Sequence, residues 1–362
     1  MDQLFWRNKK VFLTGHTGFK GAWLSLWLQH LGAEVTGYAL KPPSNPSFYD
    51  VTDISKNMVS IEGDVRDFNA LTEALVNSDA EIVFHLAAQS LVRPSYEDPI
   101  ETYSTNIMGT VNLLQAIRNC SSVRSIVNIT TDKCYENKEW LWSYRENEPL
   151  GGYDPYSSSK ACSELVTSSF TKSFFNPNRY EIHGVALATA RAGNVIGGGD
   201  WSKDRLIPDI LNSVLKKEPV RLRNPRSVRP WQHVLEPLHG YLMLAQKLYE
   251  VGGDYSSAWN FGPREEDAKS VVWVCTKLLE MMDASPAYES LSEAEAPHEA
   301  HILKLNISKA MELLGWQPKI DILHGISMVA NWTKEFNREA DMREVSLKQI
   351  FEFESLIRNE FK

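Results

Sequence analysis

A tyrosine and a lysine four residues apart, Tyr156 and Lys160, are the side chains of this chain best suited to acid–base chemistry. On a helix, positions i and i+4 lie on one face, with Cβ atoms about 5–6 Å apart. A free phenol has a pKa near ~10 and is a poor base at neutral pH, but a neighbouring cation favours the phenolate. The spacing therefore predicts a tyrosine that accepts a proton near neutral pH. The alternative is an ordinary exposed helical turn, because this spacing is common.

The composition is that of a globular protein and gives no sign of a nucleic-acid or membrane partner. The chain has 362 residues, enough for one large domain or two ordinary ones, with 43% hydrophobic and 23% charged residues. Its net charge of −8 does not favour nucleic acid or an acidic membrane surface. We expect no transmembrane helix, and residues 1–10 show no apolar signal core. The cysteines lack metal spacing and favour a reducing cytoplasm and no bound metal: Cys120, Cys134, Cys162 and Cys275.

A strand, a glycine turn, a helix and a second strand follow one another in the first forty residues. The apolar run Lys10–Thr14 leads into Gly15-His-Thr-Gly18-Phe-Lys-Gly21, and a helical stretch follows over 22–31. A new strand is predicted over 34–39. Glycines at the start of a helix let the backbone approach a pyrophosphate, which the free N–H groups and the helix dipole favour. The turn predicts a dinucleotide-binding βαβ unit; the alternative is a tight turn without a ligand.

Four further predicted strands end in polar or glycine-containing segments. The strands cover 58–62, 81–85, 124–130 and 180–190, and the segments that follow are Asp64-Val65, Leu86–Gln89, Thr131–Lys133 and Arg191–Asn194. Helical patterns lie between them at 68–76, 100–118 and 155–174. Such alternation is typical of a parallel sheet with helices on both faces. The sequence therefore predicts an α/β fold with a doubly wound, mostly parallel, Rossmann-type sheet. Ligands of such sheets bind at the carboxyl ends of the strands.

The alternation becomes irregular beyond residue 197. Helices are predicted over 206–216, 237–250, 270–282 and 308–314, with a short strand near 220–222 and an acidic surface loop over 285–300. No linker or repeat separates this part of the chain. We therefore expect a dinucleotide-binding domain over residues 1–190 and a smaller, mixed α/β substrate lobe over 191–362 that interleaves with it.

The end of the second predicted strand lacks the carboxylate that commonly binds the ribose hydroxyls of NAD. It reads Tyr38-Ala-Leu-Lys41-Pro-Pro. Lys41 would suit the 2′-phosphate of NADP, or it is a solvated loop lysine. The residues alone leave the choice between NAD and NADP open.

These motifs, in this order, resemble those of the extended short-chain dehydrogenase/reductases. The resemblance covers nearly the whole chain and rests on the glycine turn, Asp64-Val65, Leu86–Ala88, Asn106 within a helix, Thr130–Asp132 and Tyr156-x-x-x-Lys160. Within that family the chain is most similar to the nucleotide-sugar 4,6-dehydratases. The turn Gly-His-Thr-Gly-Phe-Lys-Gly-Ala-Trp and the lysine of Thr-Asp-Lys-Cys-Tyr favour those that act on CDP-glucose.

The resemblance implies NAD as cofactor and a nucleotide sugar, with CDP-glucose favoured, as substrate. The sugar would be oxidised at C4, lose water across C5 and C6, and regain the hydride at C6. The product would be CDP-4-keto-6-deoxy-D-glucose, a precursor of dideoxy sugars such as those of lipopolysaccharide O-antigens. The resemblance also implies cofactor-binding residues: Gly15, Thr17, Gly18, Phe19, Lys20, Gly21, Asp64, Val65, Leu86, Ala87, Ala88, Asn106, Tyr156 and Lys160.

The same resemblance implies a role for each catalytic side chain. Tyr156 would take the C4 hydroxyl proton, and Lys160 would lower the pKa of Tyr156 and hold the nicotinamide ribose. Thr131 would bond the C4 oxygen. Asp132 would protonate the departing C6 hydroxyl, a transfer worth ~10²–10⁴-fold; without these neighbours it would equally suggest a helix cap. Lys133 departs from the family pattern, in which a glutamate often acts as the C5 base.

We expect Lys133 to act at C5. It would be a base after losing its proton, or an ammonium that stabilises the enolate while water or Tyr156 moves the proton. The alternative is that Lys133 simply pairs with a nearby carboxylate.

A pyrophosphate suits arginine, because a guanidinium makes charge-assisted, often bidentate hydrogen bonds. By resemblance, Asn194 and Arg229 would hold the substrate pyrophosphate, and Arg205 would lie near the substrate; Arg191 belongs to the same set of arginines.

Two other functions fit the motifs. One is a nucleotide-sugar 4-epimerase, which needs Tyr156 and Lys160 but no acid at C6. The other is a non-catalytic, NAD-binding regulator. The long predicted helices 100–118 and 155–174 could pair about a two-fold axis, so a homodimer or homotetramer is expected.

Overall fold

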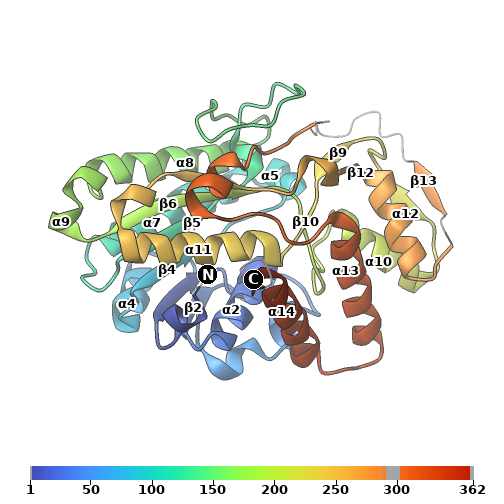
Figure 1. The fold of residues 1–362 in the computed structure, drawn as a ribbon, viewed down its shortest axis with the longest axis horizontal. Helices are drawn as coiled ribbons and strands as arrows, with labels where there is room; N and C mark the ends of the chain where they lie inside the picture. Colours follow the sequence, from blue (N-terminus) through green and yellow to red (C-terminus); the bar gives the residue numbers. More distant parts are fainter. Residues whose placement is uncertain (1, 286, 291–301, 359–362) are drawn as a thin grey trace.

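Seven parallel strands form the central sheet of the protein (Figure 1). The computed structural model describes residues 2–285, 287–290 and 302–358. The strand order is β11-β6-β5-β4-β1-β2-β3, with neighbours parallel throughout. The strands are β1 (Lys10–Thr14), β2 (Glu34–Ala39), β3 (Val59–Glu62), β4 (Ile82–His85), β5 (Ser125–Ile129), β6 (Ala186–Ala192) and β11 (Ala258–Phe261). The predicted doubly wound α/β fold is confirmed. The order reverses between β1 and β4, which is where such sheets form a ligand crevice.

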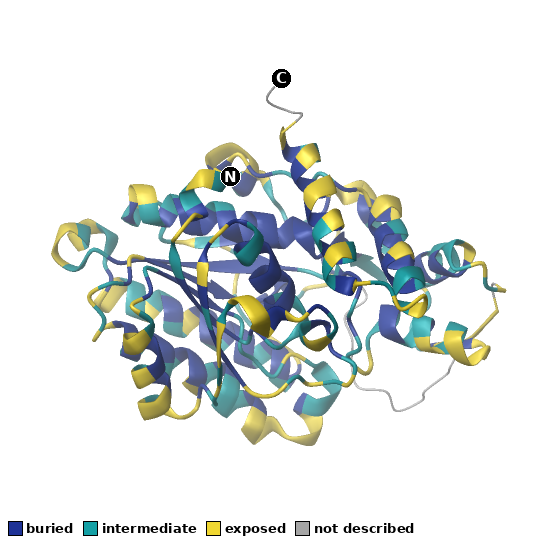
Figure 2. Cartoon of the chain, turned by 90° about the horizontal axis from the view of Figure 1, so that it is seen from below, coloured by how far each residue is buried: buried dark blue, intermediate teal, exposed yellow. Residues whose placement is uncertain are grey.

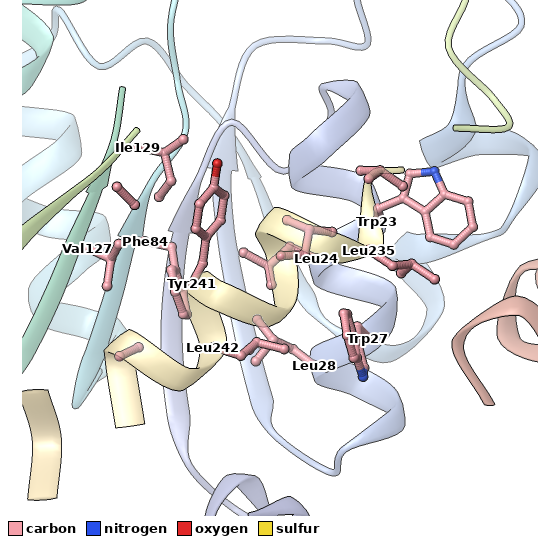
Figure 3. Packing of buried hydrophobic residues seen from close by; sticks show 14 of the residues in the cluster. Trp23, Leu24, Trp27, Leu28, Phe84, Val127, Ile129, Leu235, Tyr241 and Leu242 are labelled. Carbon is pink, nitrogen blue, oxygen red and sulfur yellow. The ribbon is translucent and has the colours of Figure 1, made fainter. Parts of the chain in front are cut away.

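Helices cover both faces of the sheet, because its central strands are buried on both sides. On one face lie α2 (Phe19–His30), α11 (Leu235–Val251) and α14 (Met342–Arg358). Figure 3 shows Tyr241 of α11 beside Phe84 of β4 and Val127 of β5, with Trp27 of α2 farther along the same apolar cluster. On the other face lie α4 (Phe68–Ser78), α7 (Gly109–Ile117) and α8 (Pro155–Ser173). Figure 2 shows buried strands enclosed by helices that are exposed on their outer sides.

A second cluster of elements builds the smaller lobe. Its core is apolar and comes mainly from α10 (Leu206–Lys216), α12 (Val271–Met281) and α13 (Ile322–Asn337). Three two-stranded sheets accompany it: β7 (Val195–Ile196) with β10 (Gln232–His233), β8 (Val220–Leu222) with β13 (Tyr288–Ser290), and β9 (Val228–Pro230) with β12 (Ala268–Ser270). The later chain also supplies β11 and α11 to the central layers. A domain boundary at residue 190 stays a prediction.

Short helices complete the described chain. They are α1 (Gln3–Trp6), α3 (Phe48–Val51), α5 (Val92–Glu97), α6 (Pro99–Tyr103) and α9 (Tyr180–His183), the 3-10 turns η1 (Ile54–Asn57), η3 (Asp132–Cys134), η4 (Pro177–Arg179), η5 (Gly253–Tyr255) and η6 (Glu265–Asp267), and the π-helical η2 (Ser104–Met108) and η7 (Ala310–Leu314). Among the described residues, no helix combines the length and apolarity that crossing a membrane requires.

The structure corrects three predicted elements. The predicted strand 180–190 begins as the helix α9, which Gly184 ends in the left-handed conformation, and the strand starts only at Ala186. The predicted helix 100–118 is helical but passes through the π segment η2. Within the predicted loop 285–300, Tyr288–Ser290 forms β13 beside β8, because its backbone pairs with that strand; residues 286 and 291–300 lie outside the described residues.

Candidate active site

Tyr156 and Lys160 lie in the first turns of α8, where a cap fixes the start of the helix. The Asp154 side chain accepts a hydrogen bond from Ser157 N at 2.9 Å, and Pro155 occupies the first helical position. Both candidate side chains are buried. Lys160 Nζ donates to the carbonyl of Ile129, the last residue of β5, at 3.1 Å. The predicted pair therefore faces the carboxyl edge of the sheet.

The three residues after β5 meet this pair. Thr131 Oγ1 donates to Asp132 Oδ1 at 3.0 Å and accepts from Lys133 N at 3.3 Å. Asp132 is buried, and its Oδ2 has no hydrogen-bond partner among the described residues. Gly193, just after β6, leaves room for that oxygen, because a Cβ on Gly193 would lie only 2.9 Å from it. A buried carboxyl oxygen without a partner is available to a ligand.

Burial dominates the electrostatics of these groups. It raises the pKa of Tyr156 to about 12, against the opposing effects of hydrogen bonding to Thr131 and of the Arg205 charge. Arg205 is thus a cation that lowers the pKa of the phenol, and the contribution expected of Lys160 stays a prediction. Burial lowers the pKa of Lys160 to about 8. It raises the pKa of Asp132, against the charges of Lys133, Arg229 and Lys20. Asp132 therefore holds its proton to higher pH than a free aspartate.

Several cations gather around this one carboxyl group. Besides Lys133 and Arg229, Lys20 lies close enough to act on Asp132, and burial with the charges of Arg205 and Lys160 lowers the pKa of Lys20 to about 8. Positive groups that repel one another are stabilised by an anionic ligand. The arrangement suits phosphate groups.

The glycine turn has the geometry of a pyrophosphate cradle. Gly15 has φ +79°, and a Cβ there would lie 2.6 Å from Ala87 N; a Cβ on Gly21 would lie 2.1 Å from Gly15 O. Gly18 differs, because the nearest atom to its Cβ would be Gly15 O at 3.4 Å, which is ordinary contact. Gly18 begins α2 and supplies no side-chain cap, so N–H groups of the first turn are free for an anion. The turn fits the pyrophosphate of a dinucleotide.

The other predicted cofactor residues lie at the strand ends around this turn. Thr17 Oγ1 donates to Leu40 O at 2.8 Å, and Ala87 N donates to Thr14 Oγ1 at 3.2 Å. Leu86 and Ala88 flank Ala87 directly after β4. The Phe19 ring lies close to Gly197, because a Cβ on Gly197 would be 3.0 Å from that ring.

Three of the predicted cofactor residues are already engaged by the protein. Asp64 binds Arg66 Nη2 at 2.5 Å, and Val65 packs closely against Gly109. Asn106, in η2, accepts from Gln89 N at 2.9 Å and donates to Ser159 Oγ at 2.8 Å, which ties the end of β4 to α8. Their contact with a cofactor stays a prediction.

A carboxylate on the neighbouring strand lies near the end of β2. Glu62 ends β3 opposite Ala39, and it lies 3.9 Å from the Lys41 ammonium at the exposed edge. Sequence inspection missed it, because only the sheet register brings residues 39 and 62 together.

A cavity of about 320 Å³ adjoins the candidate catalytic residues. Its walls include Lys133, Asn194, Arg229 and Ser157. Tyr156 and Asp132 are not lining residues, but each is adjacent in the chain to one that is. The remaining lining residues come from α5 and the segment between β5 and α8: Val92, Tyr135, Glu136, Asn137, Glu139, Gly152, Tyr153 and Asp154, with Leu303.

The predicted arginines separate into different environments. Arg205 donates to Asp200 Oδ2 at 3.1 Å and lies 3.4 Å from Ser90 Oγ, on the side of Tyr156 and Lys20. Arg229 faces the cavity. Arg191 is buried and paired with Glu164 at 2.7 Å, so its role is within the protein. The sequence analysis did not single out Glu164, although its position four residues after Lys160 was a usable signal.

These features are those of a dinucleotide-binding fold with candidate acid–base side chains at the carboxyl edge of its sheet. The chain belongs to the family described as GDP-mannose 4,6 dehydratase, whose model matches residues 12–329. The resemblance to the extended short-chain dehydrogenase/reductases is thereby confirmed.

A particular relative shares more than half of the sequence. The CDP-glucose 4,6-dehydratase of Salmonella typhimurium is 54% identical over 355 residues, which cover 98% of this chain and 99% of that protein. Two solved structures share the fold at lower identity. A dTDP-glucose 4,6-dehydratase from Bacillus anthracis in complex with NAD has a TM-score of 0.76 at 19% identity, over 92% of this chain and 98% of that one. A UDP-glucose 4-epimerase from Thermotoga maritima with UDP-glucose has a TM-score of 0.76 at 22% identity, over 90% and 99%.

Proposed function

We propose that the protein is an NAD-dependent nucleotide-sugar 4,6-dehydratase that converts CDP-D-glucose to CDP-4-keto-6-deoxy-D-glucose and water. The observation that carries the proposal is Asp132, a buried carboxyl with a raised pKa and a free Oδ2, beside Tyr156 and Thr131. A dehydratase needs such an acid, because hydroxide is a poor leaving group. The 54% identity to a CDP-glucose 4,6-dehydratase supports both the reaction and the nucleotide.

NAD is the cofactor that we assign to the glycine turn. Gly15, Gly18 and Gly21 would hold its pyrophosphate at the start of α2, and Lys160 would bind the nicotinamide ribose. NAD held there would supply an acceptor for the C4 hydride and a donor for its return to C6. Glu62 supports NAD over NADP, because its carboxylate would accept ribose hydroxyls and repel a 2′-phosphate. The related structure from Bacillus anthracis, described in complex with NAD, supports the same choice.

The residues divide the proton transfers among them. Tyr156, whose pKa burial raises and whose rise Thr131 and Arg205 oppose, takes the C4 hydroxyl proton during oxidation. Thr131 hydrogen-bonds the C4 oxygen. The resulting ketone acidifies the C5 proton, and the loss of that proton together with the C6 hydroxyl forms the alkene. Asp132 gives its proton to the departing hydroxyl, which leaves as water. To complete the product, a proton returns to C5, and the proton that Tyr156 took from the C4 hydroxyl replaces the one that Asp132 lost.

Lys133 is the residue that we assign to C5. It lines the cavity, its backbone N–H binds Thr131 Oγ1, and its charge acts on Asp132. It acts as a base after losing its proton or stabilises the enolate as an ammonium. Lys133→Met should slow exchange of the C5 proton with solvent, followed by mass spectrometry in deuterated water, and Lys133→Glu tests whether the base of the family pattern restores that exchange. Unchanged exchange in both variants would exclude a role at C5.

The cavity is the proposed site of the sugar nucleotide. Arg229 and Asn194, at one end, would bind the pyrophosphate, with Arg205 reaching the substrate from the side of Tyr156. The hexose would lie between Lys133 and Ser157, next to the catalytic groups. Neutral and acidic side chains that line the same cavity, among them Asn137 and Asp154, suit sugar hydroxyls.

Two alternatives predict other products. A 4-epimerase shares the fold, as the structure from Thermotoga maritima illustrates, but it needs no acid at C6, and Asp132 supplies one. A non-catalytic regulator would bind NAD without turnover. Incubation with CDP-, dTDP-, UDP- and GDP-glucose plus NAD separates these functions by mass. We expect loss of one water from CDP-glucose; an unchanged mass with inverted C4 would favour the epimerase, and no reaction the regulator.

We also propose a homodimer or a homotetramer. Apolar side chains are exposed on α6, η2 and α8: Ile100 is 81% exposed, Leu165 58% and Met108 49%. Pairing of these helices with a second copy would cover these side chains, and light scattering on the purified protein measures the assembly.

All four cysteines are free thiols, which suits the reducing cytoplasm that we propose as location.

A further inference from the structure

Glu164 is a buried carboxylate that the proposed reaction does not use directly. It lies on α8 four residues after Lys160, on the same face of the helix. Its two oxygens accept hydrogen bonds from Thr130 Oγ1, from Thr189 Oγ1 at 2.8 Å, and from Arg191 Nε at 2.9 Å and Nη2 at 2.7 Å. These donors come from the end of β5 and from β6. Glu164 therefore joins the helix that carries Tyr156 to the strand that leads into Thr131.

The hydrogen-bond network continues from Arg191 to the segment that follows Asp132. Arg191 Nη1 donates to the Tyr135 hydroxyl at 2.8 Å and to Glu146 O at 3.0 Å. The Tyr135 hydroxyl in turn donates to Asn260 Oδ1 at 2.7 Å. Tyr135 directly follows the η3 turn of Asp132–Cys134. The hydrogen bonds thus fix the two segments that must hold the phenol and the carboxyl at constant separation.

Charge gives Glu164 a second role. Two titratable groups among the described residues raise the pKa of Lys160: Glu164 on α8 and Cys134 on η3. The Lys160 charge in turn lowers the pKa of Lys20 on α2 and of His85 on β4. Within this described set, Glu164 is the one carboxylate. Burial lowers the pKa of Lys160 to about 8, and Glu164 is the largest influence in the opposite direction. Without it, the ammonium form would lose protons at lower pH.

We propose that Glu164 is a positioning residue of the reaction, whose buried carboxylate keeps Lys160 in the ammonium form and holds α8 against the ends of β5 and β6. The inference rests on the proposed function for its catalytic consequence. The charge on Lys160 can also be measured in the protein alone.

The primary test is the charge-neutral variant Glu164→Gln. Competitive labelling of amines across pH, with the Lys160 peptide followed by mass spectrometry, reports the midpoint of its deprotonation without NAD or substrate. We expect that midpoint to fall by about one to two pH units, the effect of losing a close opposite charge. The alkaline limb of the kcat–pH profile should move in the same direction, with little change in KM. An unchanged midpoint overturns the proposal.

Matched variants separate charge from packing. Thr189→Val removes one hydrogen bond to Glu164 but keeps the charge, so the Lys160 midpoint should stay that of the wild type. Glu354→Gln neutralises another buried glutamate, on α14 beside Trp27, and should also leave it unchanged. If Thr189→Val moves the midpoint as far as Glu164→Gln does, the role is packing alone and the proposal is overturned.

A second variant guards against failure to fold, because removing one partner of a buried ion pair leaves an uncompensated charge. Glu164→Gln with Arg191→Gln neutralises both partners. We expect this folded double variant to keep a lowered Lys160 midpoint; a wild-type midpoint would overturn the proposal. If the wild type turns over no nucleotide sugar while the midpoints shift as expected, the proposed function fails and the charge effect of Glu164 stands.

Discussion

The Asp132 carboxyl illustrates how position decides chemistry at the scale of single residues. An aspartate with an ordinary pKa of 3.8 is a poor proton donor at neutral pH, because it has already lost its proton. Burial beneath Gly193 raises that pKa, and the neighbouring cations Lys133, Arg229 and Lys20 limit the rise. The group can therefore hold a proton for a leaving hydroxyl and still accept one back.

Asp132→Asn should separate oxidation from elimination. The amide keeps the shape but carries no transferable proton, so water loss should fall by ~10²-fold or more while C4 oxidation continues. NADH absorbance should then build up with CDP-glucose. In the wild type, water loss should decline as pH rises through the raised pKa of Asp132. Asp267→Asn is the matched control, since Asp267 is also buried with an unpartnered Oδ2 and a raised pKa, but lies in the second lobe. Equal losses in both variants would contradict the assignment.

Gly193→Ala should disturb the same carboxyl from the opposite side. The added Cβ would lie 2.9 Å from Asp132 Oδ2 and from Pro230 Cγ, so the carboxyl must shift. We expect kcat to fall by about ten-fold or more, because misplacement by a fraction of an ångström weakens proton transfer. Gly325→Ala provides the control, since its nearest neighbour would be 3.6 Å away and kcat should stay unchanged. Full activity of Gly193→Ala would show that Asp132 does not need this position.

At the scale of elements, local patterns predicted most of the sheet and the motifs at its edge. The bounds of β1, β2, β8 and α10 agree with the expected ranges, since apolar runs between turn residues mark them clearly. The helix α9 was missed, although Asn176 caps the preceding turn and Gly184 stops the helix, because a run with strand propensity obscured both signals. The helices α13 and α14 were not predicted either.

Contacts between distant segments explain what the sequence could not reveal about the site. Arg205 meets Ser90 across 115 residues, and Glu62 reaches Lys41 only through the register of β2 and β3. Tyr156, Lys160, Thr131 and Asp132 could be proposed from the sequence because they lie in short segments that match the family resemblance, and their catalytic roles stay predictions. The supporting side chains are set by strand order, which no local spacing encodes.

The glycine turn gives a prediction at the scale of one element. Gly15 and Gly315 both have positive φ, +79° and +69°, so alanine strains the backbone similarly at each. Only at Gly15 would the Cβ meet backbone, 2.6 Å from Ala87 N, whereas nothing lies within 4 Å at Gly315. Gly15→Ala should therefore weaken NAD binding at least ten-fold by calorimetry, and Gly315→Ala should leave it unchanged. Similar NAD affinities in the two variants would show that the close approach to Ala87 is unimportant.

At the scale of the whole molecule, a buried glutamate on α11 hydrogen-bonds the segment that leads into α13. Glu236, in the first turn of α11, accepts hydrogen bonds at Oε1 from Lys319 N at 2.7 Å and Ile320 N at 2.5 Å, just before α13. Its Oε2 has no partner among the described residues. Burial raises its pKa to about 8, although the two backbone donors and the charges of Lys319 and Arg264 oppose the rise. The connection is thus sensitive to proton binding.

Glu236→Gln should flatten the pH dependence of stability. Between the ordinary pKa of 4.5 and about 8, the folded state holds a proton that the unfolded state has lost. Stability that is present below pH 4.5 is therefore lost as pH rises toward 8, by on the order of a few kcal/mol. The amide keeps the acceptor for both backbone groups and does not titrate, so urea unfolding of the variant should show a smaller decline of stability with rising pH.

Glu354→Gln should change the pH dependence of stability with the opposite sign. Hydrogen bonds from His30 and Trp27 lower the pKa of Glu354 despite its burial, so its contribution is lost as pH falls. Parallel pH profiles for wild type and Glu236→Gln would contradict a buried, protonated Glu236 at the junction of the two parts.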